Sequence, residues 1–152
     1  MNYPIFSDEY FMNEALKEAQ KAFDAEEIPV GAVVVVNNQI IARTGNSSRM
    51  LQDVTAHAEI LAITAASDFL GSKYLTDCTM YVTLEPCLMC AGALGWGQLS
   101  RVVYGTKDPK AGYSLHGINP FHPKTVIRSG VLEHECSDLI KKFFLERRDL
   151  RN

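Results

Sequence analysis

The sequence predicts a three-layer α/β sandwich, in which helices cover both faces of one β-sheet. Stretches of helical periodicity alternate with short apolar stretches of strand length, in the order helix, two strands, helix, strand, helix, strand, irregular segment, strand, helix. The chain has 152 residues, a length typical of one domain. Its hydrophobic and charged fractions of 47% and 22% exclude disordered and fibrous proteins. We therefore expect a single domain over residues 1–152.

The amino-terminal elements are predicted to be a helix followed by a β-hairpin. Ser7 is a favoured N-cap, and apolar residues recur at three- and four-residue spacing after it. Val30–Val36 is an apolar run of strand length, and Gln39–Arg43 can return beside it. Asn37-Asn38 suits the tight turn between them, because asparagine tolerates positive φ.

A second helix and a third strand are expected next. The polar segment Gly45–Gln52 is predicted to be a loop. Asp53 or Thr55 can then cap a helix, which Gly71 ends because glycine readily adopts the left-handed conformation. The strand Thr79–Leu84 follows this helix.

The third helix is predicted to begin at Pro86, since proline is favoured at the first helical position, and to continue towards Trp96. The remaining elements are expected to be the strand Arg101–Tyr104, an irregular segment over 106–123, the strand Lys124–Arg128 and a helix from about Glu133.

The sequence contains no membrane or export signal. Its longest apolar stretch, Ile28–Val36, has nine residues, whereas a membrane-spanning helix needs roughly 20. The first residues lack the basic and apolar regions of a signal peptide. Four cysteines are too few for a disulfide scaffold, and Cys78 and Cys136, which stand alone, are expected to be buried and inert. We expect a cytoplasmic protein.

Basic residues concentrate at the carboxyl end of the chain. The net charge is −3, yet residues 101–152 contain ten basic and six acidic residues. Only this last third of the chain could attract a polyanion such as RNA. Charge alone also fits a solvated helix end, where cations interact favourably with the helix dipole. The basic residues of the last helix are Lys141, Lys142, Arg147, Arg148 and Arg151.

Cys87, Cys90 and His57 form a candidate metal-ligand set. The two cysteines are three residues apart at a predicted helix start, so their sulfurs face the same way and the free N–H groups there favour thiolates. His57 lies at the start of the preceding helix. A Cys2His set without a fourth protein ligand is typical of catalytic zinc, because water takes the remaining position.

Glu59 is the candidate catalytic base. It lies two residues after His57, close enough to move a proton from water activated by the metal. This chemistry suits attack by hydroxide on an amidine carbon with loss of ammonia. Another interpretation of Cys-x-x-Cys is a thioredoxin-like redox motif, but that motif gives His57 and Glu59 no task.

The pattern His-x-Glu followed by Pro-Cys-x-x-Cys is typical of zinc deaminases. The sequence also resembles the bacterial tRNA-specific adenosine deaminases, members of the cytidine deaminase superfamily, over roughly residues 8 to 148. The segments that carry this resemblance are Pro29–Val33, Asn46, Thr55–Glu59, Tyr81–Ala93 and Arg101–Gly105.

The resemblance implies a cytidine deaminase-like fold with a five-stranded mixed sheet, one zinc ion per chain and a homodimer. It implies conversion of the wobble adenosine of a tRNA anticodon arm to inosine. Asn46 would hydrogen-bond the flipped nucleoside, and Ala58 would offer a backbone group to the base. Glu59 would carry the proton from water to the ring nitrogen and then to ammonia.

The last helix also contains a segment similar to that family. Phe144, Arg147 and Arg148 match a Phe-Phe-x-x-Arg-Arg segment that would lie beside the RNA. Asp108 and Lys110 belong to another shared stretch, Gly-x-x-Asp-x-Lys. A phenylalanine pair and a polar turn also have purely structural explanations.

The chain departs from the family at three places, and these affect RNA contacts and dimer packing rather than zinc. Gly95–Leu99 lacks His-Ser-Arg, Val54 replaces a common proline, and a longer basic tail is missing after Asn152. Two alternatives therefore stay open. One is a deaminase of a free base or nucleoside, of the guanine or cytidine type. The other is a non-catalytic, zinc-stabilised module that binds RNA or a partner.

Overall fold

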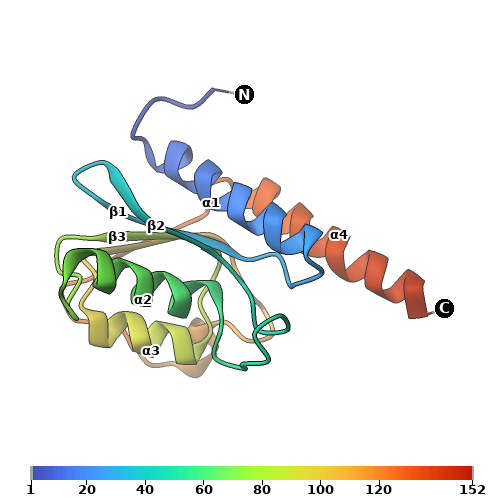
Figure 1. The fold of residues 1–152 in the computed structure, drawn as a ribbon. Helices are drawn as coiled ribbons and strands as arrows, with labels where there is room; N and C mark the ends of the chain where they lie inside the picture. The colour runs from blue at the N-terminus through green and yellow to red at the C-terminus, as the bar shows by residue number, and fades with distance from the viewer. Residues whose placement is uncertain (1, 152) are drawn as a thin grey trace.

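The computed structural model describes residues 2–151, in which a five-stranded sheet is covered by helices on both faces (Figure 1). The strand order is β2-β1-β3-β4-β5. β1 (Gly31–Val36) pairs antiparallel with both β2 (Gln39–Gly45) and β3 (Thr79–Leu84). β4 (Arg101–Thr106) is parallel to β3, and β5 (Val126–Ser129) is parallel to β4. The predicted five-stranded mixed sheet is thus confirmed.

Two pairs of helices form the outer layers. α1 (Asp8–Asp24) and α4 (Glu133–Arg151) cover one face of the sheet, and α2 (Ala58–Leu70) and α3 (Leu88–Gly97) cover the other (Figure 1). The predicted sandwich and the predicted order of elements are both confirmed. No helix within residues 2–151 combines the length and the apolar character needed to cross a membrane.

Each outer layer buries its own half of the core. Ala32 and Val34 of β1 pack in the cluster beneath α2 and α3, while Val33 and Val35 pack in the cluster beneath α1. Successive strand residues point to opposite faces, so a strand covered on both sides needs an uninterrupted apolar run. This requirement explains the continuous valine stretch of β1.

The turn and cap residues recognised in the sequence adopt the expected conformations. The Ser7 hydroxyl accepts a hydrogen bond from the backbone N–H of Tyr10 and caps α1. Asn37 and Asn38 have φ of 49° and 61° in the hairpin turn. Gly71 ends α2 with φ 64°. These positions are determined by local backbone preferences.

The predicted cap of α2 was wrong. The Asp53 carboxylate accepts hydrogen bonds from the backbone N–H and the hydroxyl of Thr55, at 2.8 and 2.7 Å, so both side chains are used in a turn before the helix. α2 begins at Ala58, and its N-cap residue is His57, whose side chain makes no capping hydrogen bond. The histidine therefore lies one position before the first helical turn.

The predicted start of α3 was also wrong. The helix begins at Leu88 after the N-cap residue Cys87, two residues later than the proline rule predicts. The carbonyl of Pro86 accepts a hydrogen bond from Tyr113 N–H at 2.9 Å, and Cys87 forms an isolated β-bridge with Gly112. Pairing with this distant loop keeps the chain extended and delays the helix.

Pairing between strands also changes the boundaries of several elements. β2 and β4 continue two residues further than expected, to Gly45 and Thr106, because neighbouring strands extend the ladder. The last strand is Val126–Ser129 rather than Lys124–Arg128. The segment before it, predicted to be irregular, contains the short 3-10 helix Tyr113–His116.

Candidate functional site

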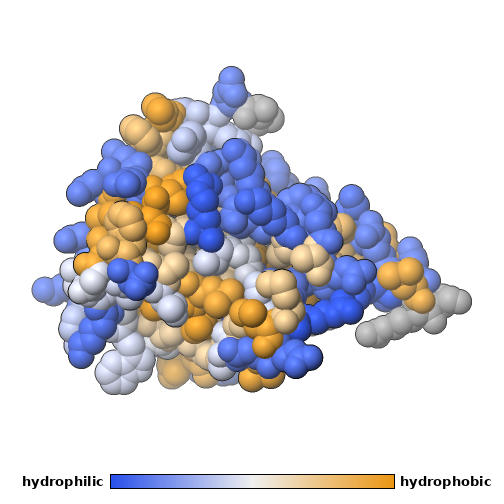
Figure 2. Space-filling model, in the orientation of Figure 1, coloured by the Kyte–Doolittle hydropathy of each residue, from blue (hydrophilic) through white to orange (hydrophobic). Residues whose placement is uncertain are grey.

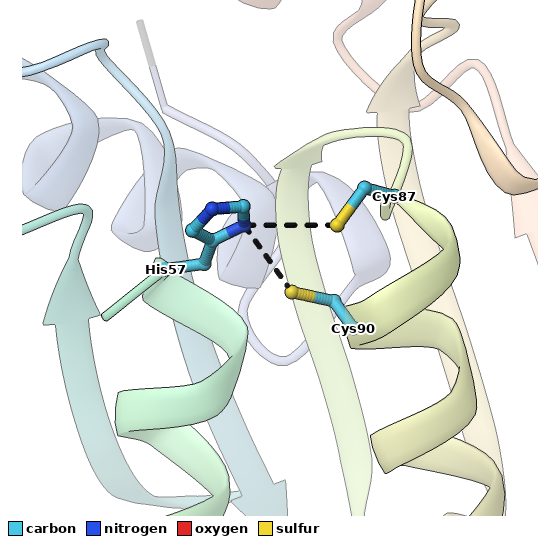
Figure 3. A group of neighbouring side chains, drawn as sticks. All are labelled: His57, Cys87 and Cys90. Atoms are coloured by element: carbon cyan, nitrogen blue, oxygen red, sulfur yellow. Dashed lines mark hydrogen bonds between the residues drawn. The ribbon is translucent and has the colours of Figure 1, made fainter. Parts of the chain in front are cut away.

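The candidate ligand set lies where the amino ends of α2 and α3 meet. His57 and Cys87 are the N-cap residues of the two helices, and Cys90 lies in the first turn of α3. Neither N-cap side chain caps its own helix. Instead the imidazole points between the two sulfurs, with Nδ1 3.7 Å from Cys87 Sγ and 3.5 Å from Cys90 Sγ (Figure 3).

These distances fit a tetrahedral zinc site. A nitrogen about 2.1 Å and a sulfur about 2.3 Å from a tetrahedral zinc ion lie roughly 3.6 Å from each other. The three candidate ligand atoms all lie within 4.8 Å of one another. In residues 2–151 no fourth histidine, cysteine, aspartate or glutamate joins this group. Among the described residues, three candidate ligands thus lie together without a fourth.

The two thiols differ in acidity. The Cys90 thiol, together with the backbone N–H of Cys90 and the His57 ring, lowers the pKa of Cys87 to about 5. The pKa of Cys90 is raised, because its thiol donates to Cys87, is buried, and faces the Glu59 carboxylate. Without a metal, one negative charge is held by the pair. A thiolate, the form that binds metal, is thus present at neutral pH.

Glu59 is buried beside this group. It is the second residue of α2, its side chain lines the cavity described below, and only 4% of the residue is exposed. Burial raises the pKa of Glu59 to about 7, and the negative charge at Cys87 acts in the same direction. A carboxyl group with a pKa near neutrality can both accept and release a proton.

The group opens into a cavity of about 760 Å³. A cavity of this size suits a ligand such as one nucleoside. Its lining includes His57, Ala58, Glu59 and Cys87. One wall is formed by residues 108–111 after β4, and another by the face of α4 that includes Ser137, Ile140, Lys141, Phe144, Arg147 and Arg148.

Asn46 and Ala58 offer hydrogen-bonding groups to this cavity. Asn46 is 8% exposed; its Nδ2 donates to the Ile28 carbonyl at 3.4 Å, while its Oδ1 is buried without a partner among the described residues. A buried acceptor of this kind is available to a ligand. The Ala58 carbonyl accepts from Thr44 Oγ1 at 2.6 Å, so the free backbone group of Ala58 is its N–H at the helix start.

The three predicted residues of α4 all reach the cavity, but their surroundings differ. Phe144 is 47% exposed, and Arg148 is exposed as well. Arg147 donates to the Glu26 carbonyl at 2.7 Å, and its guanidinium lies 4.8 Å from the Phe143 ring centre. Arg147 therefore also attaches α4 to the turn that follows α1. The side chain of Arg151 lies outside the described residues.

Other cavity residues were missed by the sequence reasoning. Ser137 and Ile140 share one face of α4 with Phe144, and this spacing of three, four and seven residues was a usable signal. Glu85 also lines the cavity. Its residue type and position gave no sign of a role, because its partners lie more than 20 residues further along the chain.

Comparison with known proteins identifies several relatives. The family of MafB19-like deaminases matches residues 6–148. The tRNA-specific adenosine deaminase of Bacillus subtilis is 46% identical over 146 residues, covering 93% of this chain and 91% of the relative.

Two solved structures share the fold. One comes from a study of A-to-I editing by tRNA:A34 deaminases at the wobble position of transfer RNA. It has a TM-score of 0.80 and 41% identity, and the match covers 86% of this chain and 98% of that one. The other, guanine deaminase from Bacillus subtilis, has a TM-score of 0.64 and 35% identity, with 78% and 71% covered.

Proposed function

Because the chain belongs to the MafB19-like deaminase family, and within it to the tRNA-specific adenosine deaminases, we propose that it converts the wobble adenosine of a tRNA anticodon to inosine. The reaction is a hydrolysis, in which water replaces the amino group at C6 of adenine and ammonia leaves. The observation that carries this proposal is the buried Glu59 beside the three-ligand group, in the lining of a nucleoside-sized cavity.

One zinc ion per chain is assigned to His57, Cys87 and Cys90. Two thiolates and an imidazole form a soft ligand set that suits zinc, and their spacing matches a tetrahedron. When bound, zinc supplies a Lewis acid that makes a water molecule in the open position more acidic. The amino ends of α2 and α3, which both point at the group, further stabilise the thiolates.

Glu59 carries the proton through the reaction. Its carboxylate accepts a proton from the attacking water and passes it to N1 of the adenine ring. A second proton taken from the same oxygen goes to the leaving amino group, which departs as ammonia. The near-neutral pKa of Glu59 suits both directions of transfer, because neither the charged nor the protonated form is strongly favoured.

Asn46, Ala58 and α4 bind the nucleotide. Asn46 Oδ1 accepts a hydrogen bond from the flipped nucleoside, and the Ala58 N–H donates one to the base. Phe144 presents an exposed ring on which a neighbouring base can stack, and Arg148 contacts the phosphate backbone. A free base or nucleoside needs no basic and aromatic wall, so these residues favour RNA as the substrate.

We also propose that two copies of this single-domain chain associate and act in the cytoplasm, where tRNA is modified. Trp96 on α3 is 85% exposed, and Leu88 and Met89 of the same helix are exposed too. An exposed tryptophan with apolar neighbours on the same helix is a candidate interface. In Figure 2 hydrophobic residues are interspersed with hydrophilic ones over the layer of α2 and α3, whereas the visible side of α1 and α4 is mostly hydrophilic.

The test is to incubate the protein with total tRNA and, in parallel, with free adenosine, cytidine and guanine. We expect inosine in the tRNA sample alone, and none with the Glu59→Ala variant. A product from a free base or nucleoside without inosine in tRNA would contradict the proposal and favour the first alternative. The absence of product from every substrate would favour a non-catalytic module.

A further inference from the structure

Glu85 is a buried carboxylate to which the proposed reaction gives no role. It follows the last residue of β3, precedes Cys87 by two positions, and is 2% exposed. Removing a carboxylate from water is unfavourable unless hydrogen bonds replace the lost hydration. A glutamate at this position therefore requires a specific set of donors.

Those donors come from the two ends of one loop. Glu85 Oε1 accepts from the backbone N–H of Asp108 at 3.1 Å. Glu85 Oε2 accepts from the backbone N–H of Ser114 at 3.0 Å and from the Ser114 hydroxyl at 2.7 Å. Each carboxylate oxygen thus binds one end of the segment Asp108–Ser114, which we call the wall loop.

The wall loop is also folded upon itself. The Asp108 carboxylate accepts from the N–H groups of Lys110 and Ala111, at 3.0 and 3.1 Å. The Asp108 carbonyl accepts from Gly112 N–H at 3.0 Å. Internal bonds of this kind make the segment a compact turn, and its placement then depends on the groups that bind its two ends.

The loop meets both the ligand segment and the cavity. Gly112 forms a β-bridge with Cys87, and residues 108–111 form a cavity wall. A Cβ atom added at Gly112 would lie 2.4 Å from the Glu85 carboxylate, closer than real contacts allow. An alanine at Gly112 would therefore force the Glu85 carboxylate to shift away from the donors that bind it.

We propose that Glu85 is a positioning residue, which holds the wall loop as the side of the cavity against which the nucleotide binds. This inference rests on the proposed function for its substrate. Glu85 does not touch the reacting atoms; it acts through residues 108–111. Losing it should weaken substrate binding more than the chemical step, because its side-chain hydrogen bonds among the described residues go to the wall loop and not to Glu59 or the ligand side chains.

The first test is Glu85→Gln. The glutamine side chain keeps one acceptor oxygen and turns an NH2 group towards the other end of the loop, where donors already point. We expect KM for a tRNA anticodon stem–loop to rise about tenfold while kcat changes less than about threefold. Hydrogen exchange of the Asp108 and Ser114 amides should become at least about tenfold faster. Zinc content should stay unchanged.

Ser114→Ala is the milder variant, which keeps the inference testable if Glu85→Gln does not fold. It removes one of the three hydrogen bonds and leaves both backbone bonds in place. We expect a rise of about threefold in KM with normal kcat. Unchanged KM and unchanged exchange of the loop amides in both folded variants would overturn the inference.

Gly112→Ala tests the same contact from the other side, and Gly92→Ala is its control. Gly92 lies in α3, has no positive φ, and a Cβ there would meet nothing within 4 Å. We expect Gly112→Ala to reproduce the rise in KM and to add little to the effect of Glu85→Gln. We expect Gly92→Ala to leave KM unchanged. Equal effects of both glycine variants would contradict the inference.

Failure of this inference can be told apart from failure of the proposed function. If the unaltered protein forms no inosine in tRNA, the proposed function fails. Faster exchange of the wall-loop amides in Glu85→Gln would even then support the role of Glu85 in holding the loop. A fall in kcat at unchanged KM would instead overturn the positioning role.

Discussion

The two faces of the sheet differ in how their polar side chains are paired. On the face of α1, Asp8 accepts hydrogen bonds from both guanidinium nitrogens of Arg101, at 3.1 and 3.0 Å, from the Tyr81 hydroxyl at 2.7 Å, and from Arg128. Beside the amino ends of α2 and α3, Glu59 and Asn46 line a cavity instead, and Asn46 Oδ1 has no hydrogen-bond partner among the described residues. The first arrangement stabilises the fold, and the second leaves polar groups available to a ligand.

The pKa values of the two carboxylates reflect this difference. The Arg101 guanidinium, with Tyr81 and Arg128, holds the pKa of Asp8 well below its ordinary value. Burial raises the pKa of Glu59 to about 7. Asp8 therefore stays charged at neutral pH and contributes to stability, whereas Glu59 can exchange a proton. Substitutions on the two faces should consequently separate activity from stability.

Loss of the metal site should have the largest effect on inosine formation. Removal of zinc by a chelator, or Cys90→Ser, should reduce inosine formation to the detection limit, because the activated water is lost. Metal analysis should find about one zinc ion per chain in the unaltered protein and much less than one in the variant. The control is Cys78→Ala, since Cys78 is a buried cysteine outside the ligand group. Full activity in metal-free protein would refute the zinc assignment.

Glu59→Ala should have the next largest effect. We expect kcat to fall by about 10³-fold, because the proton carrier is removed, while zinc content and melting temperature stay close to normal. Glu59 forms no salt bridge among the described residues, so removing its buried carboxyl group should not lower stability. Turnover at the normal rate in this variant would exclude Glu59 from the mechanism.

Asp8→Asn should produce the reverse result. We expect the free energy of unfolding to fall by about 2 kcal/mol at pH 7, because charge-assisted hydrogen bonds to Arg101 are weakened, while kcat/KM measured below the melting temperature is unchanged. Chemical denaturation measures the difference. A loss of activity in the folded variant would break the comparison between the two faces.

The same variant tests the pH dependence of stability. The pKa of Asp8 is lower in the folded state than in the unfolded chain. Its stabilisation is therefore complete above the unfolded pKa of about 4 and is lost as the pH falls towards the folded pKa. The difference in stability between the unaltered protein and Asp8→Asn should narrow below about pH 4. A constant difference down to pH 2 would contradict the assigned shift.

Arg147 and Arg148 of α4 should show the smallest effects on tRNA binding. Arg148→Ala should weaken tRNA binding about fivefold and reduce its salt dependence, with an unchanged melting temperature. Arg147→Ala should weaken binding and also lower the melting temperature, since its contacts with Glu26 and Phe143 are lost. Binding measured at several salt concentrations tests both variants. Unchanged affinity and salt dependence would assign the two side chains to structure alone.

Sequence reasoning identified those parts of the protein that local chemistry determines. Ser7 and Gly71 are recognised because a cap or a positive φ favours few residue types. His57, Cys87 and Cys90 are recognised because metal ligands need particular side chains at short spacings, and the structure brings them together. The alternation of helices with apolar strands likewise fixed the number and order of the elements.

Tertiary structure decided whatever depends on partners distant in the chain. The N-cap positions of His57 and Cys87 depend on contacts that sequence rules for caps do not include, and the late start of α3 follows from pairing with Gly112. The role of Glu85 depends on hydrogen bonds to a loop that begins 23 residues later in the chain. The sequence alone determined which chemistry the chain can perform, because that depends on residue types. Folding decided which groups are paired and which face the cavity, because only packing brings distant donors and acceptors within hydrogen-bond distance.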